Sequence, residues 1–313
     1  MNKLQPKVSV IMPTYNRAHF IGESLDYIRE QSFVNWECLI IDDGSTDDTE
    51  EFLESYTVKD PRIKYYKRSQ SHLKGPSGCR NQGLDLARGE FVIFFDSDDI
   101  VHPENLQICI NAITKHDFQF CRYDKKPFWK DWNKNFIFEN DNFQETELSL
   151  NDLSTMVTME SGFACCTVMW RKNCLNGLRF NEELSYAEEW EYYTRLLSQG
   201  IKGVSINKVL YYNRKHLESN TGEFWAKDPV RRASKLKAAV EVINTLSQKG
   251  LLSPQLVQYF IRLGFFLKHK PLIDQVLKRS NADRIKRFKY FLGYSLYPLI
   301  KPIFRMKSKI IKA

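Results

Sequence analysis

The sequence predicts an α/β fold with a mainly parallel sheet, flanking helices and a helical C-terminal extension. Short apolar segments alternate with amphipathic ones through the first 120 residues, a pattern typical of β-α-β crossovers. From residue 229 the pattern is that of amphipathic helices. We therefore expect a main domain at 1–220, divided into halves at 1–123 and 124–220, then a helical region at 221–283 and a tail at 284–313.

Four predicted strands are compact and apolar, as strands buried on both faces should be. They are Lys7–Met12, Glu37–Ile41, Ile63–Tyr66 and Phe91–Phe95. Three predicted helices lie between them, each opened by a capping or breaking residue, and they are Ala18–Gln31, Thr46–Tyr56 and Ser77–Arg88. The alternation of strands and helices of this length predicts that the strands run parallel.

The region from Asp124 to Gln199 has poor periodicity as far as a helix predicted at Glu188–Leu197. Irregular segments of this kind usually carry binding residues. We expect the region to shape a binding site or lid rather than to extend the sheet. Two further amphipathic helices are predicted at Pro229–Lys249 and Pro254–Lys268.

The net charge of +8 belongs to the tail. Nine of the 46 Lys and Arg residues, and none of the 38 Asp and Glu residues, lie at 284–313, which leaves 37 basic against 38 acidic residues in the first 283 positions. The tail is also rich in aromatic and aliphatic residues, so it is too apolar for a simple nucleic-acid-binding arm. We expect an interfacial helix attracted to anionic lipid. In the alternative, its apolar side chains pack on the protein and its lysines are solvated.

The seven cysteines form no Cys-x-x-Cys pair and the six histidines do not cluster, which argues against a disulfide framework and against structural zinc. The N-terminal apolar stretch is far shorter than a signal-peptide core. The longest apolar run, at 290–300, is 11 residues, whereas a membrane-spanning helix needs roughly 20. We expect a cytoplasmic protein, peripheral on the inner face of the cell membrane.

Carboxylates follow the strand predicted at Phe91–Phe95, in the segment Asp96-Ser97-Asp98-Asp99. The carboxyl edge of a parallel sheet is where open α/β folds bind ligands. One carboxylate can accept a hydrogen bond from a sugar hydroxyl while another binds Mg²⁺ or Mn²⁺ shared with a diphosphate. Alternatively, Asp98 or Asp99 caps the helix that begins near Pro103.

Two other strands also end in polar clusters, Asp42-Asp43-Gly44-Ser45 and Pro13-Thr14-Tyr15-Asn16-Arg17. The first offers acceptors for a base or ribose, although Asp-Gly-Ser is also common turn chemistry. In the second, an aromatic ring can stack on a base and Arg17 can meet phosphate. Three such clusters on one edge of one sheet predict a nucleotide-diphosphate site.

These motifs resemble, in order and spacing, those of family 2 glycosyltransferases with the GT-A fold. The matching segments are Val8–Arg17, Asp42–Thr49, Gly78–Gly83 and Phe95–Asp99. The resemblance is strong over residues 7–105 and looser to about 220. It implies an inverting hexosyl- or N-acetylhexosaminyltransferase that uses a nucleotide-activated sugar, most often a UDP-sugar, with Mn²⁺ or Mg²⁺. A glycan or lipid-linked saccharide acceptor in surface polysaccharide synthesis is the expected partner.

The resemblance also implies roles for single residues of the donor half. Pro13 and Tyr15 would line the base pocket, and Asp42 would accept a hydrogen bond from the uracil ring. Asp98 would be the direct metal ligand. The other residues implied to contact the nucleotide sugar are Arg17, Arg80, Asn81, Asp96 and Ser97.

In the acceptor half, Glu189 aligns with the general base that removes the acceptor proton. The family usually has Asp there, so Glu191 stays open as a substitute, and acids in a first helical turn also complement the helix dipole. After the last predicted core strand, the resemblance assigns Arg214 to the leaving-group charge and His216 to the metal or diphosphate.

Two other classes of function stay open at this stage. In one, Asp96 is the nucleophile of a phosphohydrolase, although such motifs usually follow the first strand. In the other, the chain is a non-catalytic module that binds nucleotide sugars or membranes. The only support for this alternative is that Glu189 stands where the family usually has Asp.

Overall fold

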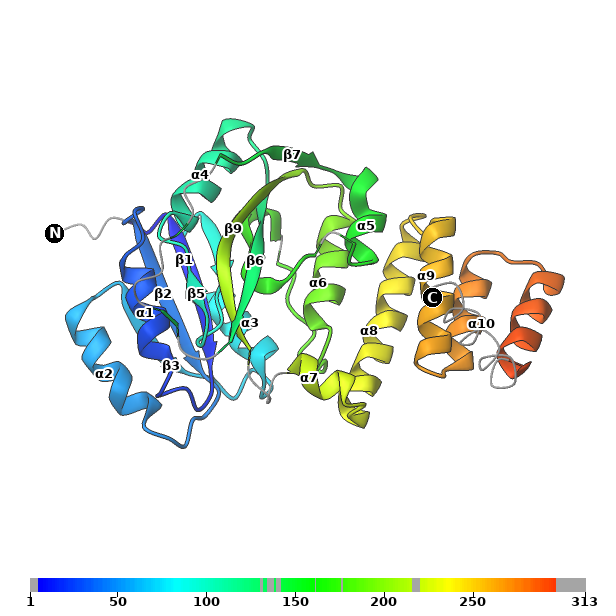
Figure 1. The fold of residues 1–313 in the computed structure, drawn as a ribbon, viewed down its shortest axis with the longest axis horizontal. Helices are drawn as coiled ribbons and strands as arrows, with labels where there is room; N and C mark the ends of the chain where they lie inside the picture. Colours follow the sequence, from blue (N-terminus) through cyan, green and yellow to red (C-terminus); the bar gives the residue numbers. More distant parts are fainter. Residues whose placement is uncertain are drawn as a thin grey trace, which may run out of the picture. The chain divides into compact units, whose positions relative to one another are not determined.

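The computed structural model describes residues 5–129, 132–133, 138, 142–160, 162–175, 177–215 and 220–296. The chain forms two compact units, Met1–Lys235 and Leu236–Ala313. The first unit contains the sheet and the helices up to the start of α8 (Pro229–Gln248). The second contains the rest of α8 and the helices that follow it (Figure 1).

Nine strands of the described residues form one sheet in the order β3-β2-β1-β4-β8-β6-β9-β5, with β7 paired to β9. The parallel pairs are β1–β2, β2–β3, β1–β4 and β6–β9, and the first three confirm the predicted parallel arrangement. The strands are β1 Val8–Thr14, β2 Trp36–Asp42, β3 Ile63–Lys67, β4 Phe91–Phe94, β5 Ile100–Val101, β6 Phe120–Trp129, β7 Glu145–Leu148, β8 Val168–Arg171 and β9 Gly203–Lys215.

The expectation that residues 124–199 would not extend the sheet is wrong. Strand β8 inserts between β4 and β6 and runs antiparallel to both, and β7 pairs antiparallel with β9. Both strands have only four residues, too few to show an alternating pattern. Their pairing partners lie far away in the sequence, so only the tertiary fold specifies them.

Helices cover both faces of the sheet in the first unit (Figure 1). One layer packs on the face that carries Val8, Val10 and Met12, where Leu25, Leu53 and Leu106 complete a core cluster. These three leucines come from α1 Ile21–Arg29, α2 Thr49–Lys59 and α4 Asn105–Lys115. The opposite face carries α3 Pro76–Leu86 and α6 Glu188–Leu197. Short helices complete the unit, and they are α5 Leu153–Val157, α7 Asn220–Trp225 and the 3-10 turns at 150–152, 165–167 and 172–175.

Helix α3 lies directly on β1 because Gly83 has no side chain. A Cβ at this position would lie 2.3 Å from Cγ2 of Ile11, which is far inside van der Waals contact. The close approach fixes the helix that carries Arg80 and Asn81 against the sheet. Gly83 therefore helps to position the helix that carries part of the predicted site.

The second unit is helical. Helix α9 (Pro254–Phe266) is capped by Ser253, whose hydroxyl accepts a hydrogen bond from the Leu256 N–H, and α10 spans Lys270–Arg279. Residues 284–296 are also helical. Among the described residues, no helix is both long and apolar enough to span a membrane.

The helix at 284–296 has two different sides. Tyr294 contacts Phe265 with ring centroids 5.3 Å apart, and Phe291 lies under the Lys270 ammonium at 4.9 Å. Arg287 forms an ion pair of 2.7 Å with Asp274. Another set of apolar residues is exposed, and it comprises Ile285, Phe288, Leu292 and Leu296. In the described part of the tail, one side of the helix packs on neighbouring helices, as in the second arrangement weighed from the sequence, and the lipid contact of the exposed side stays a prediction.

Candidate active site

The carboxyl ends of β1, β2 and β4 meet at one edge of the sheet and open onto a cavity of about 820 Å³. Thr14 lies level with Asp42 across the first strand pair, as expected of parallel strands. This edge is where open α/β sheets bind ligands. Nine of the residues predicted from the sequence line the cavity, and they are Pro13, Tyr15, Arg17, Arg80, Asp96, Ser97, Asp98, Glu189 and Arg214.

At the β2 end of the cavity, Asp43 rather than Asp42 faces the open space. Asp42 is buried, and its Oδ1 accepts hydrogen bonds from the Gly44 and Ser45 backbone while its Oδ2 accepts one from the Tyr65 hydroxyl at 2.7 Å. Asp43 lines the cavity and pairs with Arg68 at 2.5 Å. The uracil contact predicted for Asp42 stays a prediction, and the geometry offers its neighbour for that role.

The three carboxylates after β4 lie in different environments. Asp96 is partly exposed in the cavity, whereas Asp98 pairs with Arg17 at 3.5 Å. Asp99 is buried and accepts a hydrogen bond of 2.7 Å from the Arg214 backbone N–H, so it does not cap α4. Burial, and then the charges of Asp96 and Asp98, raise the pKa of Asp99 well above its ordinary value.

The same carboxylates fit a hard divalent cation. Ligand atoms of Asp96, Asp99 and Cys166 lie within 4.8 Å of one another. Burial raises the pKa of the Cys166 thiol, so it stays protonated and is a poor ligand for Mn²⁺ or Mg²⁺. The carboxylate oxygens are the suitable ligands, and a cation would offset the burial and the neighbouring negative charges that raise the pKa of Asp99. The geometry thus makes Asp96 and Asp99 candidate ligands, and the metal contact predicted for Asp98, which pairs with Arg17, stays a prediction.

Arg80 joins the two halves of the cavity. It projects from α3, and its guanidinium lies 3.1 Å from Oε1 of Glu188 and 3.5 Å from Oδ1 of Asp96. Glu188 begins α6, and Asp96 follows β4. One buried cation therefore holds the start of α6 next to the carboxylates at the strand end.

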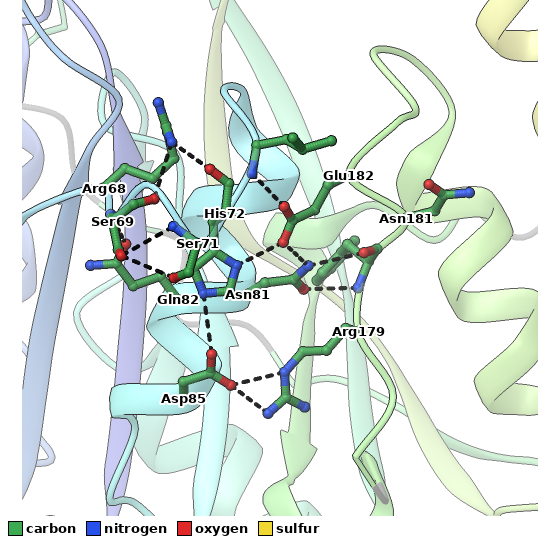
Figure 2. A network of polar contacts seen from close by, with 12 residues as sticks. Arg68, Ser69, Ser71, His72, Asn81, Gln82, Asp85, Arg179, Asn181 and Glu182 are labelled. Carbon is green, nitrogen blue, oxygen red and sulfur yellow. Dashed lines mark hydrogen bonds and ion pairs between the residues drawn. The ribbon is translucent and has the colours of Figure 1, made fainter.

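Asn81, next to Arg80, points away from the cavity. Its amide nitrogen donates to the Phe180 carbonyl at 2.9 Å, and its amide oxygen accepts from the Phe180 N–H at 2.8 Å. The amide nitrogen also donates to Oε1 of Glu182. Figure 2 shows Asn81 and Glu182 in a polar network with His72, which contacts both Glu182 and Asp85. These contacts hold the segment at 179–182 against α3 and the loop at 68–75. The donor contact predicted for Asn81 stays a prediction.

Glu189 lies on the wall of the cavity that α6 forms. Its Oε2 accepts a hydrogen bond of 2.6 Å from the Cys165 backbone N–H, which fixes the carboxylate at the cavity wall. Glu191 is buried, does not line the cavity and pairs with Arg195 at 2.5 Å. Of the two acids considered as the base, the geometry places only Glu189 in a position to meet a substrate.

Arg214 lines the cavity, but its guanidinium is largely engaged. It donates to the Asp98 carbonyl at 2.9 Å, pairs with Glu23 at 2.5 Å and lies between the rings of Phe20 and Phe128. The residue thus fastens β9 to the segment that carries the carboxylates. His216, the other residue predicted beside it, lies outside the described residues.

The cavity wall includes residues that the sequence did not predict as site residues, among them Asp43, Lys125 and Lys235. Asp43 lies beside the predicted Asp42, and the doubled Asp of the motif was the available signal. Lys125 of β6 lies with its Nζ 3.8 Å from the Cys166 sulfur, and Lys235 of α8 also reaches the cavity. No local pattern marks these two lysines, because they reach the site from distant parts of the chain.

The sequence model of glycosyl transferase family 2 matches residues 9–172, which is more than half of the chain. A relative from Campylobacter jejuni, GalNAc(5)-diNAcBac-PP-undecaprenol beta-1,3-glucosyltransferase, is 33% identical over 182 residues. The match covers 57% of this chain and 56% of the relative. The chain thus spans little more than half the length of that protein.

The fold is similar to that of several solved structures, two of which contain a bound nucleotide sugar. S. aureus TarS 1–349 in complex with UDP-GlcNAc aligns with a TM-score of 0.60 at 22% identity, over 94% of this chain and 92% of the other. The mannosyltransferase PcManGT from Pyrobaculum calidifontis, in complex with GDP-Man and Mn²⁺, aligns with a TM-score of 0.57 at 17% identity, over 98% and 84%. Both likenesses support the predicted fold class.

The family match, the relative and the shared fold agree with the motifs identified from the sequence. They confirm the predicted family and fold, and they give no support to the phosphohydrolase alternative. The chain belongs to glycosyl transferase family 2 and has the GT-A fold followed by C-terminal helices.

Proposed function

We propose that the protein transfers a sugar from a UDP-sugar to a lipid-linked saccharide, with Mn²⁺ or Mg²⁺, in the synthesis of a surface polysaccharide. The observation that carries this proposal is the single cavity in which Arg80 holds Asp96 beside the start of α6. Donor-side carboxylates and the candidate base Glu189 thereby face the same space. An inverting transfer needs both in one cavity.

The donor end of the cavity suits a nucleoside diphosphate. Tyr15 offers a partly exposed ring for stacking, and Asp43 offers a carboxylate to the N–H of a base. Carboxylates of the segment Asp96–Asp99 would hold the divalent cation. When bound, the cation supplies positive charge for the departing diphosphate. Arg17 and Arg80 lie at the cavity wall, where they can orient phosphate or sugar oxygens.

The acceptor end supplies the proton acceptor. Glu189 would take the proton of the acceptor hydroxyl as that oxygen attacks the anomeric carbon from the face opposite the diphosphate. The Cys165 N–H holds one carboxylate oxygen, which leaves the other for the substrate. A positioned carboxylate of this kind requires no movement of the backbone during the reaction.

The C-terminal tail suits an anionic lipid surface. On the helix at 284–296 the exposed residues Ile285, Phe288 and Leu292 follow a helical spacing, so they form one apolar stripe. Exposed basic residues at 284 and 289 lie on either side of this stripe. An apolar stripe with basic flanks is the pattern of helices that lie in a membrane interface. Such attachment at the inner face of the membrane would bring the enzyme to a lipid-linked acceptor.

Vesicle binding tests the membrane part of the proposal. The double variant Phe288→Ser with Leu292→Ser should lose co-sedimentation with phosphatidylglycerol-containing vesicles. Val58→Ser, which changes another exposed apolar residue, should bind as the parent does. Equal binding of the double variant and the parent would contradict the role of the stripe.

A donor screen tests the enzymatic part. The purified protein with Mn²⁺ would be incubated with UDP-glucose, UDP-N-acetylglucosamine, UDP-galactose and GDP-mannose, and release of UDP or GDP would be measured. We expect slow hydrolysis of at least one UDP-sugar and none of GDP-mannose. Hydrolysis of GDP-mannose alone would overturn the uridine assignment, and hydrolysis of no UDP-sugar would overturn the proposed donor class.

A further inference from the structure

We propose that the ammonium group of Lys235 binds a phosphate group of the acceptor and so positions the acceptor next to Glu189. This inference rests on the proposed function and specifies its acceptor side. Lys235 lines the same cavity as Glu189 although it comes from α8. Its Nζ lies over the ring of Trp190, 3.6 Å from the ring centroid.

The start of α8 is fixed to the acceptor side of the cavity. The hydroxyl of Ser234 donates to the Tyr186 carbonyl at 2.8 Å and accepts from the Tyr186 N–H at 2.9 Å. Arg231 donates to the Ser185 carbonyl at 2.5 Å. These bonds hold the turn before α6 and the first turns of α8 together. The place of Lys235 beside Glu189 is therefore built into the fold.

Lys235 lacks the carboxylate partner that two arginines of the cavity have. Arg17 pairs with Asp98, and Arg80 pairs with Glu188. Over the part of the chain that the structure describes, the Lys235 ammonium has neither a hydrogen bond nor an ion pair. The Trp190 ring contacts one side of the ammonium, and its N–H groups can donate to a ligand oxyanion in the cavity.

The charges around Lys235 are consistent with a site that is filled by an anion. Burial lowers the pKa of Lys235 to about 8, and the charge of Glu189 offsets part of that effect. Glu188 and Tyr186 are the other titratable groups of the neighbouring segment that line the cavity. Burial raises the pKa of both, so Tyr186 stays neutral at physiological pH. A phosphate that binds Lys235 would supply the counter-charge.

The position favours the acceptor over the donor. The diphosphate of the donor belongs with the carboxylate-bound cation at the end of β4, whereas Lys235 lies beside the group that takes the acceptor proton. A lipid diphosphate and a phosphodiester within a glycan both offer this chemistry. Either would place a hydroxyl of the same molecule within reach of Glu189.

The test uses inorganic phosphate as the probe. The full-length protein is first saturated with UDP and Mg²⁺, which fills the donor site, and phosphate is then titrated by calorimetry. We expect Lys235→Met to weaken phosphate binding by about 10- to 100-fold, the loss expected when a hydrogen bond to a charged group is removed. Lys237→Met, on an exposed position of the same helix outside the cavity wall, should bind phosphate as the parent does.

A pH series separates a binding role from a structural one. With a pKa of about 8, Lys235 loses its proton as the pH rises from about 8 to about 9.5, so phosphate affinity of the parent should fall over that range. Lys235→Arg stays charged and should keep its affinity. Competition by farnesyl diphosphate indicates a lipid diphosphate, and competition by glycerophosphoglycerol indicates a phosphodiester.

The outcomes distinguish this inference from the proposed function. If UDP does not bind the parent protein, the proposed donor fails. If UDP binds the parent and Lys235→Met equally, but phosphate binds neither or binds both alike, the role of Lys235 is refuted. A fall in affinity with pH that Lys235→Arg shares with the parent would also refute it.

Discussion

Replacement of Glu189 by Gln should remove the general base while it preserves the shape of the site. The amide oxygen of Gln can still accept the hydrogen bond that the Cys165 N–H donates at 2.6 Å, so the side chain keeps its position. The amide cannot accept a proton at neutral pH. A positioned general base contributes about 10²- to 10⁴-fold in rate, or about 3–5 kcal/mol of activation free energy.

The assay is steady-state consumption of the UDP-sugar found in the donor screen, together with the dissociation constant of UDP. Glu189→Gln should lower kcat by the stated factor and leave UDP affinity and the thermal midpoint close to those of the parent. Glu191→Gln is the matched control, because it loses the buried ion pair with Arg195 and should lower stability while kcat of the folded protein persists. A Glu189→Gln enzyme with kcat within about threefold of the parent would refute the assignment, since a positioned base contributes far more.

Three further predictions concern the scaffold and the donor end. Gly83→Ala should cost about 1–3 kcal/mol of unfolding free energy in urea, because the new Cβ meets Ile11 at 2.3 Å; an unchanged midpoint would contradict the close packing. Burial raises the pKa of Glu37, but hydrogen bonds from Lys64 and other groups outweigh burial, so the pKa is lower in the folded protein than in the unfolded chain. The ionised Glu37 carboxylate therefore stabilises the fold above the unfolded pKa, and this stabilisation is lost as the pH falls below about 4.5. Glu37→Gln should thus be less stable than the parent by about 2 kcal/mol at pH 7. Thermal unfolding measured across pH should show that this difference in stability shrinks in acid. A difference that stays constant with pH would contradict the role of the ionised carboxylate. Asp43→Asn should weaken UDP binding about tenfold, as expected for one lost hydrogen bond to a charged group, and unaltered affinity by calorimetry would exclude the contact.

The sequence was most informative where structure is local or where parallel strands converge. The strand that ends before Asp96 and the one that ends before Asp42 are apolar segments followed by acids, and a parallel sheet must bring such ends together. The helix at Glu188–Leu197 has the predicted bounds, because its acidic first turn and apolar spacing are both local signals.

The sequence was least informative where the site depends on contacts between distant segments. The side chain of Asp42 turned out to be engaged by its own turn and by Tyr65, which the motif alone does not reveal. Lys235 reaches the cavity because contacts such as the one between Ser234 and Tyr186, across 48 positions, hold α8 there. Strand β8 is too short to show a period and is specified by its neighbours β4 and β6.

The central claim is that the cavity at the ends of β1, β2 and β4 is a cation-dependent nucleotide-sugar site. The most direct measurement is the dissociation constant of UDP by calorimetry, with Mn²⁺ and again with excess chelator, for the parent and for Asp98→Ala. We predict that UDP binds the parent protein in the presence of Mn²⁺. Chelation of the cation should weaken UDP binding at least tenfold, as the loss of one charged contact would. The Asp98→Ala variant should bind UDP weakly in both conditions. Binding of UDP that is indifferent to chelator and to the Asp98→Ala change, or no binding of UDP at all, would contradict the claim.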